Sequence, residues 1–181
     1  MERTSLIFDL ARLAPAGAAQ TSGADLKRLY DEAFPAENLL PLVTSLQAHG
    51  DVHAWGAFID GQLIGHVLLT PVTVTGSELA FVLLGPLAVL PRVQRKGAGS
   101  ALVRHAVAAL PGETAGALVL GDPGYYSRFG FQHETAITPP YALPIEWQGA
   151  WQSLRLNWKR RWPSGPLVVP QPWAKPALWL P

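Results

Sequence analysis

Apolar residues in the first part of the chain recur at helical spacing. A first helix is predicted after Ser22, with its apolar residues on one face, namely Leu26, Leu29, Tyr30 and Ala33. Ser22 and Asp25 have the spacing of a capping box, which satisfies two backbone N–H groups at a helix start. A second helix is predicted between Asn38 and Gly50, with apolar positions at Leu39, Val43 and Leu46. The apolar cluster in residues 5–13 predicts a strand before both helices.

Residues 53–90 contain three β-rich runs, separated by Asp60-Gly61 and by Thr75-Gly76. Asp-Gly between apolar runs is a strong signal for a two-residue hairpin, so we expect an antiparallel meander. A helix follows the third run, and the apolar residues 116–121 are typical of a buried strand. Strand, helix and strand form a crossover that requires parallel pairing. This order predicts an α/β fold with a mixed, mostly antiparallel central sheet, one parallel crossover and flanking helices.

The pattern after residue 131 admits two interpretations. Four tryptophans share one face if the segment is a long helix, namely Trp147, Trp151, Trp158 and Trp162. Leu154, Leu156 and Trp158 instead alternate as in a strand, and prolines on both sides limit the length of any helix. We therefore expect a helical turn near Ile145 and a strand over residues 151–158. The six prolines of residues 163–181 predict an extended tail along the surface, after a single domain over residues 1–162.

Composition narrows the class of protein. The chain has 181 residues, 49% of them hydrophobic, and a net charge of +1, as expected of one globular domain. This near-neutral balance gives no general attraction to nucleic acid, and the cluster WKRRW at residues 158–162 is typical of a solvated turn. No run approaches the roughly 20 apolar residues of a membrane span, and the N-terminal residues lack the apolar core of a signal peptide. We expect a cytoplasmic protein that binds neither membranes nor nucleic acid.

Metal chemistry is not expected. The chain contains no cysteine, which excludes disulfides, a thiolate nucleophile and zinc sites built from cysteine. His49 and His53 have the i, i+4 spacing of a metal pair, but Gly50 and Asp51 disfavour the continuous helix that such a pair needs. We therefore predict no metal cofactor.

A cationic loop with two glycines precedes the helix that follows the third β-rich run. Arg92, Arg95 and Lys96 supply positive charge, and Gly97 and Gly99 lack the Cβ that would keep a ligand from the backbone. Free N–H groups at a helix start and the helix dipole together bind anions. A P-loop needs Gly-Lys-Ser/Thr, and a Rossmann loop needs a third glycine where the chain has leucine, so neither motif fits. The loop predicts a multiply charged phosphate ligand, most simply a pyrophosphate.

Two segments resemble a known family. Gln94, Gly97 and Gly99 fill the pattern Q/R-x-x-G-x-G/A, which resembles the acetyl-CoA signature of the GNAT superfamily of N-acetyltransferases. The sequence GDPGYYSRFGF at residues 121–131 is similar to the short helix and strand that close the GNAT core. Its form resembles one bacterial branch of predicted acetyltransferases with poorly defined substrates. The resemblance covers residues 5–135 and implies a GNAT-like fold with acetyl-CoA as the cosubstrate.

The resemblance also implies roles for individual residues. The backbones of Leu87 and Val89 would contact the pantetheine arm. Seven residues of the loop and helix start would bind acetyl-CoA, namely Gln94, Arg95, Lys96, Gly97, Ala98, Gly99 and Ser100. Tyr126 stands five residues before Phe131, which is the family's spacing for the tyrosine beside the thioester sulfur. A phenol with a pKa near 10 can protonate a thiolate whose thiol pKa is near 8.5, so Tyr126 is the candidate general acid; its alternative role is core packing.

The dipeptide Gly85-Pro86 interrupts the run that looks like the family's central strand. Because proline cannot donate to a sheet, this dipeptide marks either a bulge or a simple kink of an edge strand. A bulge would expose backbone donors that polarise the thioester carbonyl.

The general base stays open. Many relatives carry a glutamate just before the Leu-x-Val end of this strand, where the chain has no carboxylate. The candidates are Glu37, Asp122, His66 and His133, together with a chain of water molecules. The missing carboxylate also leaves an alternative function, a non-catalytic acyl-CoA-binding sensor or pseudoenzyme.

The expected reaction is direct transfer of an acetyl group from the CoA thioester to a primary amine, without a covalent enzyme intermediate. The acceptor is a small-molecule or peptide amine, and the protein is a monomer or a homodimer. The tryptophan-rich C-terminal region either walls an apolar pocket or packs into the core.

Overall fold

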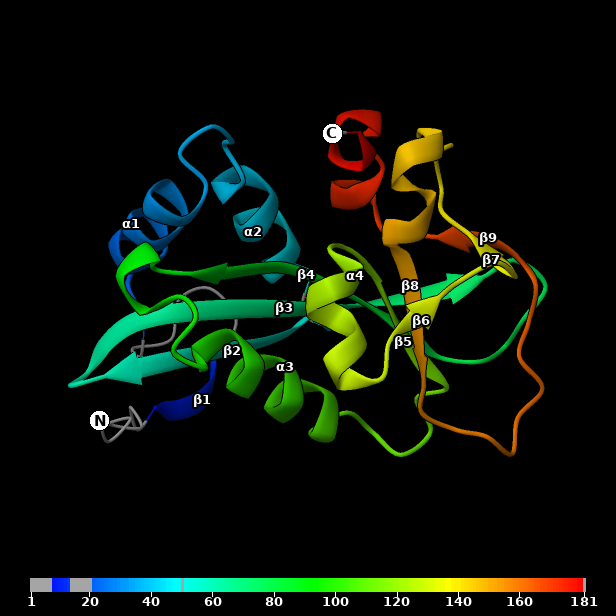
Figure 1. The fold of residues 1–181 in the computed structure, drawn as a ribbon, viewed down its shortest axis with the longest axis horizontal. Coiled ribbons are helices and arrows are strands. Elements are labelled where there is room, and N and C mark those ends of the chain that lie inside the picture. Colours follow the sequence, from blue (N-terminus) through cyan, green and yellow to red (C-terminus); the bar gives the residue numbers. More distant parts are fainter. Residues whose placement is uncertain (1–7, 14–20, 50, 181) are drawn as a thin grey trace. The chain divides into compact units, whose positions relative to one another are not determined.

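The computed structural model describes residues 8–13, 21–49 and 51–180 (Figure 1). The chain divides into two units, one formed by Met1–Leu69 with Gly85–Ala109 and the other by Thr70–Leu84 with Leu110–Pro181. Strands β3 (Gln62–Val74) and β4 (Phe81–Val89) each contribute one part to either unit. The expected boundary between residues 162 and 163 stays a prediction.

The first unit contains three antiparallel strands that begin with β1 (Asp9–Leu13) and β2 (His53–Ile59). β1 pairs with β2, and β2 pairs with β3. Asp60 and Gly61, which connect β2 to β3, have φ values of 49° and 74°. Two positive φ values in succession are those of a type I′ turn, so the Asp-Gly hairpin is confirmed. The predicted strand over residues 5–13 is β1 from Asp9 onward; residues 5–7 lie outside the described part.

Helices α1 (Gly23–Ala33) and α2 (Leu40–Gln47) follow β1. The Ser22–Asp25 capping box at the start of α1 is confirmed, since Ser22 Oγ accepts from the Asp25 N–H at 3.1 Å and Asp25 Oδ2 accepts from the Ser22 N–H at 3.3 Å. The expected start of α2 at Asn38 is wrong by one residue, because Leu39 precedes the helix and no side chain caps it. Pro41 stands in its first turn, where a missing N–H loses no hydrogen bond.

Helix α3 (Ala98–Ala108) and helix α1 cover opposite faces of β3 in this unit (Figure 1). A Cβ on Gly65 would come within 2.9 Å of Leu102 Cδ1, so this glycine lets α3 approach the strand closely. The next residue, His66, points to the other face and reaches Tyr30 of α1. The alternation of side chains along a strand thus assigns each helix its face.

The second unit contains β5 (Gly116–Leu120), α4 (Pro123–Tyr126) and the strands β6 (Gln132–His133), β7 (Ile137–Thr138), β8 (Trp151–Arg155) and β9 (Gly165–Val168). Phe81–Leu83 of β4 pair in parallel with Gly116–Leu118 of β5. β8 runs antiparallel to both β5 and β6, while β9 pairs antiparallel with β3 and parallel with β7. The predicted crossover and the mixed, mostly antiparallel α/β fold are confirmed.

The C-terminal part agrees with the sequence in two respects and differs in a third. The helical turn at Ile145–Ala150 and the strand after it are confirmed, although β8 ends at Arg155. The expected surface tail is wrong, because β9 joins β3 and the indoles of Trp173 and Trp179 are buried. Trp173 Nε1 donates to Thr70 Oγ1 at 3.1 Å, and Trp179 Nε1 donates to the Trp173 carbonyl at 2.9 Å. Prolines here start short 3-10 turns and leave the indoles free to pack.

No helix among the described residues is long and apolar enough to cross a membrane.

Candidate functional site

The loop between β4 and α3 is folded back onto its own strand. After β4 the chain makes a single 3-10 turn, Pro91–Val93. The side-chain amide of Gln94 then donates from Nε2 to the Val89 carbonyl at 3.0 Å, and the backbone N–H of Gln94 donates to the Leu90 carbonyl at 3.2 Å. Gln94 therefore fixes the loop's shape, which leaves the following residues to face a ligand.

The start of α3 has free backbone donors. Gly97 precedes the helix with φ = 99°, a conformation that favours glycine, and no side chain caps the helix. The first intrahelical bond runs from the Ala101 N–H to the Gly97 carbonyl at 2.9 Å, so the N–H groups of Ala98, Gly99 and Ser100 have no intrahelical acceptor. The starts of α1 and α4, in contrast, are capped by side chains. An anion at the start of α3 would satisfy the free donors there.

Two of the three expected cations are available to such an anion. Arg95 and Lys96 are exposed, and neither is paired with another residue in the described part of the chain. Arg92 instead donates from Nη2 to Gln62 Oε1 at 2.6 Å, and its Nη1 lies 3.6 Å from Glu32 Oε2. The expectation that Arg92 serves as a third cationic arm is therefore wrong, because other side chains hold its guanidinium.

The end of β4 presents alternate residues to solvent. Leu87 and Val89 are half-buried, while Ala88 and Leu90 are fully buried. The Gly85-Pro86 peptide is cis, and Gly85 has φ = 142°. Whether this dipeptide forms a bulge or a kink stays a prediction.

Tyr126, the last residue of α4, packs inward in the second unit. Asp122 starts this short helix, since its Oδ1 accepts from the Gly124 N–H at 2.8 Å. The Tyr126 ring is 9% exposed and packs edge-on against Tyr125 and Phe131, with centroid distances of 5.0 and 5.7 Å. Its hydroxyl forms no hydrogen bond with a described residue. Sequence analysis left open which of the two adjacent tyrosines packs inward, and it is Tyr126.

The environment of Tyr126 changes its acidity. Burial, and to a smaller extent Tyr125, raise the pKa of Tyr126 well above its usual value. The sequence-based premise of an ordinary phenol pKa is therefore wrong. At neutral pH the hydroxyl stays protonated and can donate a hydrogen bond or a proton only to a strongly basic partner.

The four candidate bases occupy different settings. His66 is fully buried, its Nδ1 lies 2.9 Å from the Tyr30 hydroxyl, and burial lowers its pKa to about 3. An imidazole with no access to solvent cannot reach an incoming amine, so His66 is excluded as a base. Asp122 uses Oδ1 to cap α4. Glu37 and His133 are exposed.

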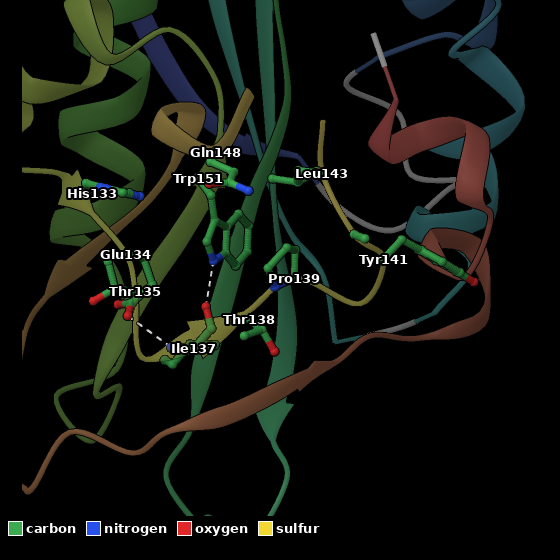
Figure 2. A pocket seen from close by; sticks show the side chains of 11 residues that line it. His133, Glu134, Thr135, Ile137, Thr138, Pro139, Tyr141, Leu143, Gln148 and Trp151 are labelled. Carbon is green, nitrogen blue, oxygen red and sulfur yellow. Dashed lines mark hydrogen bonds between the residues drawn. The ribbon is translucent and has the colours of Figure 1, made fainter. Parts of the chain in front are cut away.

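A cavity of about 520 Å³ lies in the second unit and is lined by His133, Trp151 and residues between them (Figure 2). Sequence analysis raised an aromatic pocket only as one of two roles for the C-terminal region, and nothing in the residue pattern located it. Among the described residues, no group of three or more His, Cys, Asp or Glu side chains is placed to hold a metal ion.

Comparison with known proteins identifies relatives of the whole fold. Residues 23–131 match the Acetyltransferase (GNAT) family. The chain is 30% identical over 150 residues to the uncharacterized N-acetyltransferase YjhQ of Escherichia coli, which covers 76% of this chain and 81% of YjhQ. It is 34% identical over 99 residues to YhbS of the same organism, but that match spans only 54% of this chain and 57% of YhbS.

Two solved structures are similar over nearly the full length. The GNAT family N-acetyltransferase YhbS from Escherichia coli, in complex with CoA, has a TM-score of 0.81 at 25% identity and covers 97% of this chain and 96% of its own. A GNAT family acetyltransferase from Brucella melitensis, in complex with acetyl-CoA, has a TM-score of 0.71 at 27% identity and covers 92% and 97%. The family match over more than half of the chain and these similar structures agree: the chain belongs to the GNAT family of acetyltransferases.

Proposed function

We propose that the protein is an acetyl-CoA-dependent N-acetyltransferase. The observation that carries the proposal is the uncapped start of α3 with its three free N–H groups, beside two unpaired cations. The two similar structures described above contain CoA and acetyl-CoA, which supports the same ligand here.

The residues at this helix start fit the phosphates of acetyl-CoA. Backbone donors of Ala98, Gly99 and Ser100 would hydrogen-bond phosphate oxygens, and the absence of a Cβ on Gly99 lets those oxygens come close. Arg95 and Lys96 would add charge-assisted bonds. Gln94 acts indirectly, because its bond to Val89 sets the loop's conformation. The half-buried backbone at Leu87 and Val89 is proposed to contact the pantetheine arm.

The proposed reaction is one direct substitution. The amine nitrogen of the acceptor attacks the thioester carbonyl carbon, the C–S bond breaks, and the amine loses a proton to a base. Tyr126 is proposed to give its phenolic proton to the departing thiolate. Because burial raises the pKa of Tyr126, this transfer is favourable only if the thiolate is also shielded from water and correspondingly basic. For the base, Glu37, His133 and bulk water stay open.

Calorimetry combined with a thiol-release assay tests this function. The parent protein should bind acetyl-CoA and release CoA thiol with at least one primary amine of a broad panel. Binding without any thiol release would contradict the enzyme and favour an acyl-CoA-binding sensor.

A further inference from the structure

The cavity in the second unit has a fixed apolar wall. Its largest side chain is Trp151, which is 2% exposed and whose Nε1 donates to the Ile137 carbonyl at 2.7 Å. On another side its indole meets the ring of Trp179 edge-on, with centroids 6.0 Å apart. Pro139 and Leu143 extend the apolar lining, and Figure 2 shows the indole at the centre of the group. A wall held in this way is formed before a ligand arrives.

The cavity offers no free charge to a ligand. Among the described residues that line it, Glu134 is the single carboxylate, and no lysine or arginine is present. Glu134 Oε1 accepts from the N–H groups of Ala136 and Ile137 at 2.6 and 3.0 Å, and Oε2 accepts from Trp162 Nε1 at 3.0 Å. Both oxygens are thus committed to the protein's own donors. A ligand with a second cationic or an anionic group would lose its hydration here without finding a partner.

The wall of the cavity and the seat of Tyr126 are built on neighbouring positions. Trp151 of β8 pairs with Leu120 of β5, and the next residue, Gly121, carries the Tyr126 ring against its Cα. The carbonyl of Gly121 accepts from Gln152 Nε2 at 3.0 Å. Two adjacent residues of β8 thereby hold the cavity wall and the strand end beneath Tyr126.

We propose that this cavity binds the body of the acceptor, and that the acceptor is a primary amine with one amino group on an uncharged aromatic or branched aliphatic body. The inference rests on the proposed acetyl transfer for the word acceptor. A volume of about 520 Å³ is within the usual range of small-molecule sites, which is roughly 300–1,000 Å³. Apolar walls favour such a body, and the committed Glu134 disfavours polyamines and other multiply charged amines.

Binding of a fluorinated probe tests the site without depending on catalysis. We expect 4-fluorophenethylamine to bind the parent protein, observed as ¹⁹F line broadening. Leu143→Arg should weaken this binding at least tenfold, because it places bulk and charge into the lining. Ile145→Arg is the matched control, since Ile145 is two residues away, 82% exposed and outside the lining. Equal binding in the two variants, or no binding to the parent, would overturn the proposal.

A second variant guards against a folding defect in Leu143→Arg. Thr138 lines the cavity but is itself exposed, so Thr138→Trp should fill the space without disturbing the core, and it should weaken probe binding as well. Unchanged probe binding to Thr138→Trp would overturn the site.

Thiol release from acetyl-CoA separates this proposal from the proposed function. Faster release with phenethylamine than with spermidine, and its loss in Leu143→Arg, would support both. Release with spermidine alone would keep the acetyltransferase and overturn the acceptor class. Probe binding that depends on Leu143, with no thiol release from any amine, would keep the pocket and contradict the proposed function.

Discussion

The ring of Tyr126 lies against the Cα of Gly121, so closely that a Cβ on Gly121 would overlap ring atom Cε2. The glycine ends β5, and the tyrosine follows five residues later at the end of α4. The two residues are therefore one structural unit, in which the strand end determines where the phenol stands.

This contact predicts the effect of Gly121→Ala. The added methyl group should displace the Tyr126 ring, lower turnover at least tenfold and destabilise the fold by about 1–3 kcal/mol through overpacking. Gly112→Ala is the control, because a Cβ there meets nothing within 4 Å. Steady-state thiol release and thermal unfolding measure the two effects. Parent-like turnover in Gly121→Ala would show that the ring position is unimportant.

The proposed acid role makes Tyr126→Phe selective for chemistry. The variant keeps the ring packing and removes only the proton, so acetyl-CoA affinity should change little. Turnover should fall by roughly 10²- to 10⁴-fold, the usual contribution of one general acid. Tyr125→Phe should have a much milder effect on turnover. Undiminished turnover in Tyr126→Phe would contradict the acid role.

Sequence reasoning located the elements whose signals are local. The Asp60-Gly61 turn and the Ser22 cap were predictable because each depends on the conformation of a few adjacent residues. The fold class followed from the order of strands and the helix between them, together with the family resemblance.

The remaining features depend on residues distant in sequence. The partners of Arg92 come from β3 and α1, the raised pKa of Tyr126 comes from the burial of its ring, and Trp173 finds Thr70 across 103 positions. The cavity likewise combines β6, β7 and β8. No local pattern specifies such contacts, so the sequence could not indicate them.

His66 predicts a loss of stability in mild acid. Its folded pKa of about 3 lies below the ordinary value near 6.5, so the unfolded chain takes up a proton at a higher pH than the folded protein does. The contribution is fully present above pH 6.5 and declines as pH falls toward 3. Between pH 7 and pH 5 the free energy of unfolding should drop by about 2 kcal/mol from this residue.

Urea denaturation at both pH values measures this drop. His66→Gln, which cannot be protonated, should show a weaker pH dependence than the parent even if it is less stable overall. An identical pH dependence in parent and variant would rule out His66 as the cause.

The loop cations predict a contrast between neighbouring arginines. Arg95→Ala combined with Lys96→Ala should weaken acetyl-CoA binding by about 1–3 kcal/mol, because charge-assisted bonds to phosphate are lost. Arg92→Ala should change the affinity little, since Gln62 and Glu32 hold that guanidinium. Calorimetric titration of the two variants measures both affinities. Equal weakening in both would show that the phosphates do not distinguish these positions.

The central claim is that the start of α3 holds acetyl-CoA, and titration calorimetry of Gly99→Val tests it most directly. Valine places two methyl groups where the phosphate oxygens would approach the backbone, while the helix that follows can still form. We predict that the variant folds, as judged by circular dichroism, and gives no binding heat with acetyl-CoA under conditions that saturate the parent. A folded Gly99→Val protein that binds acetyl-CoA with the parent's affinity would contradict the claim.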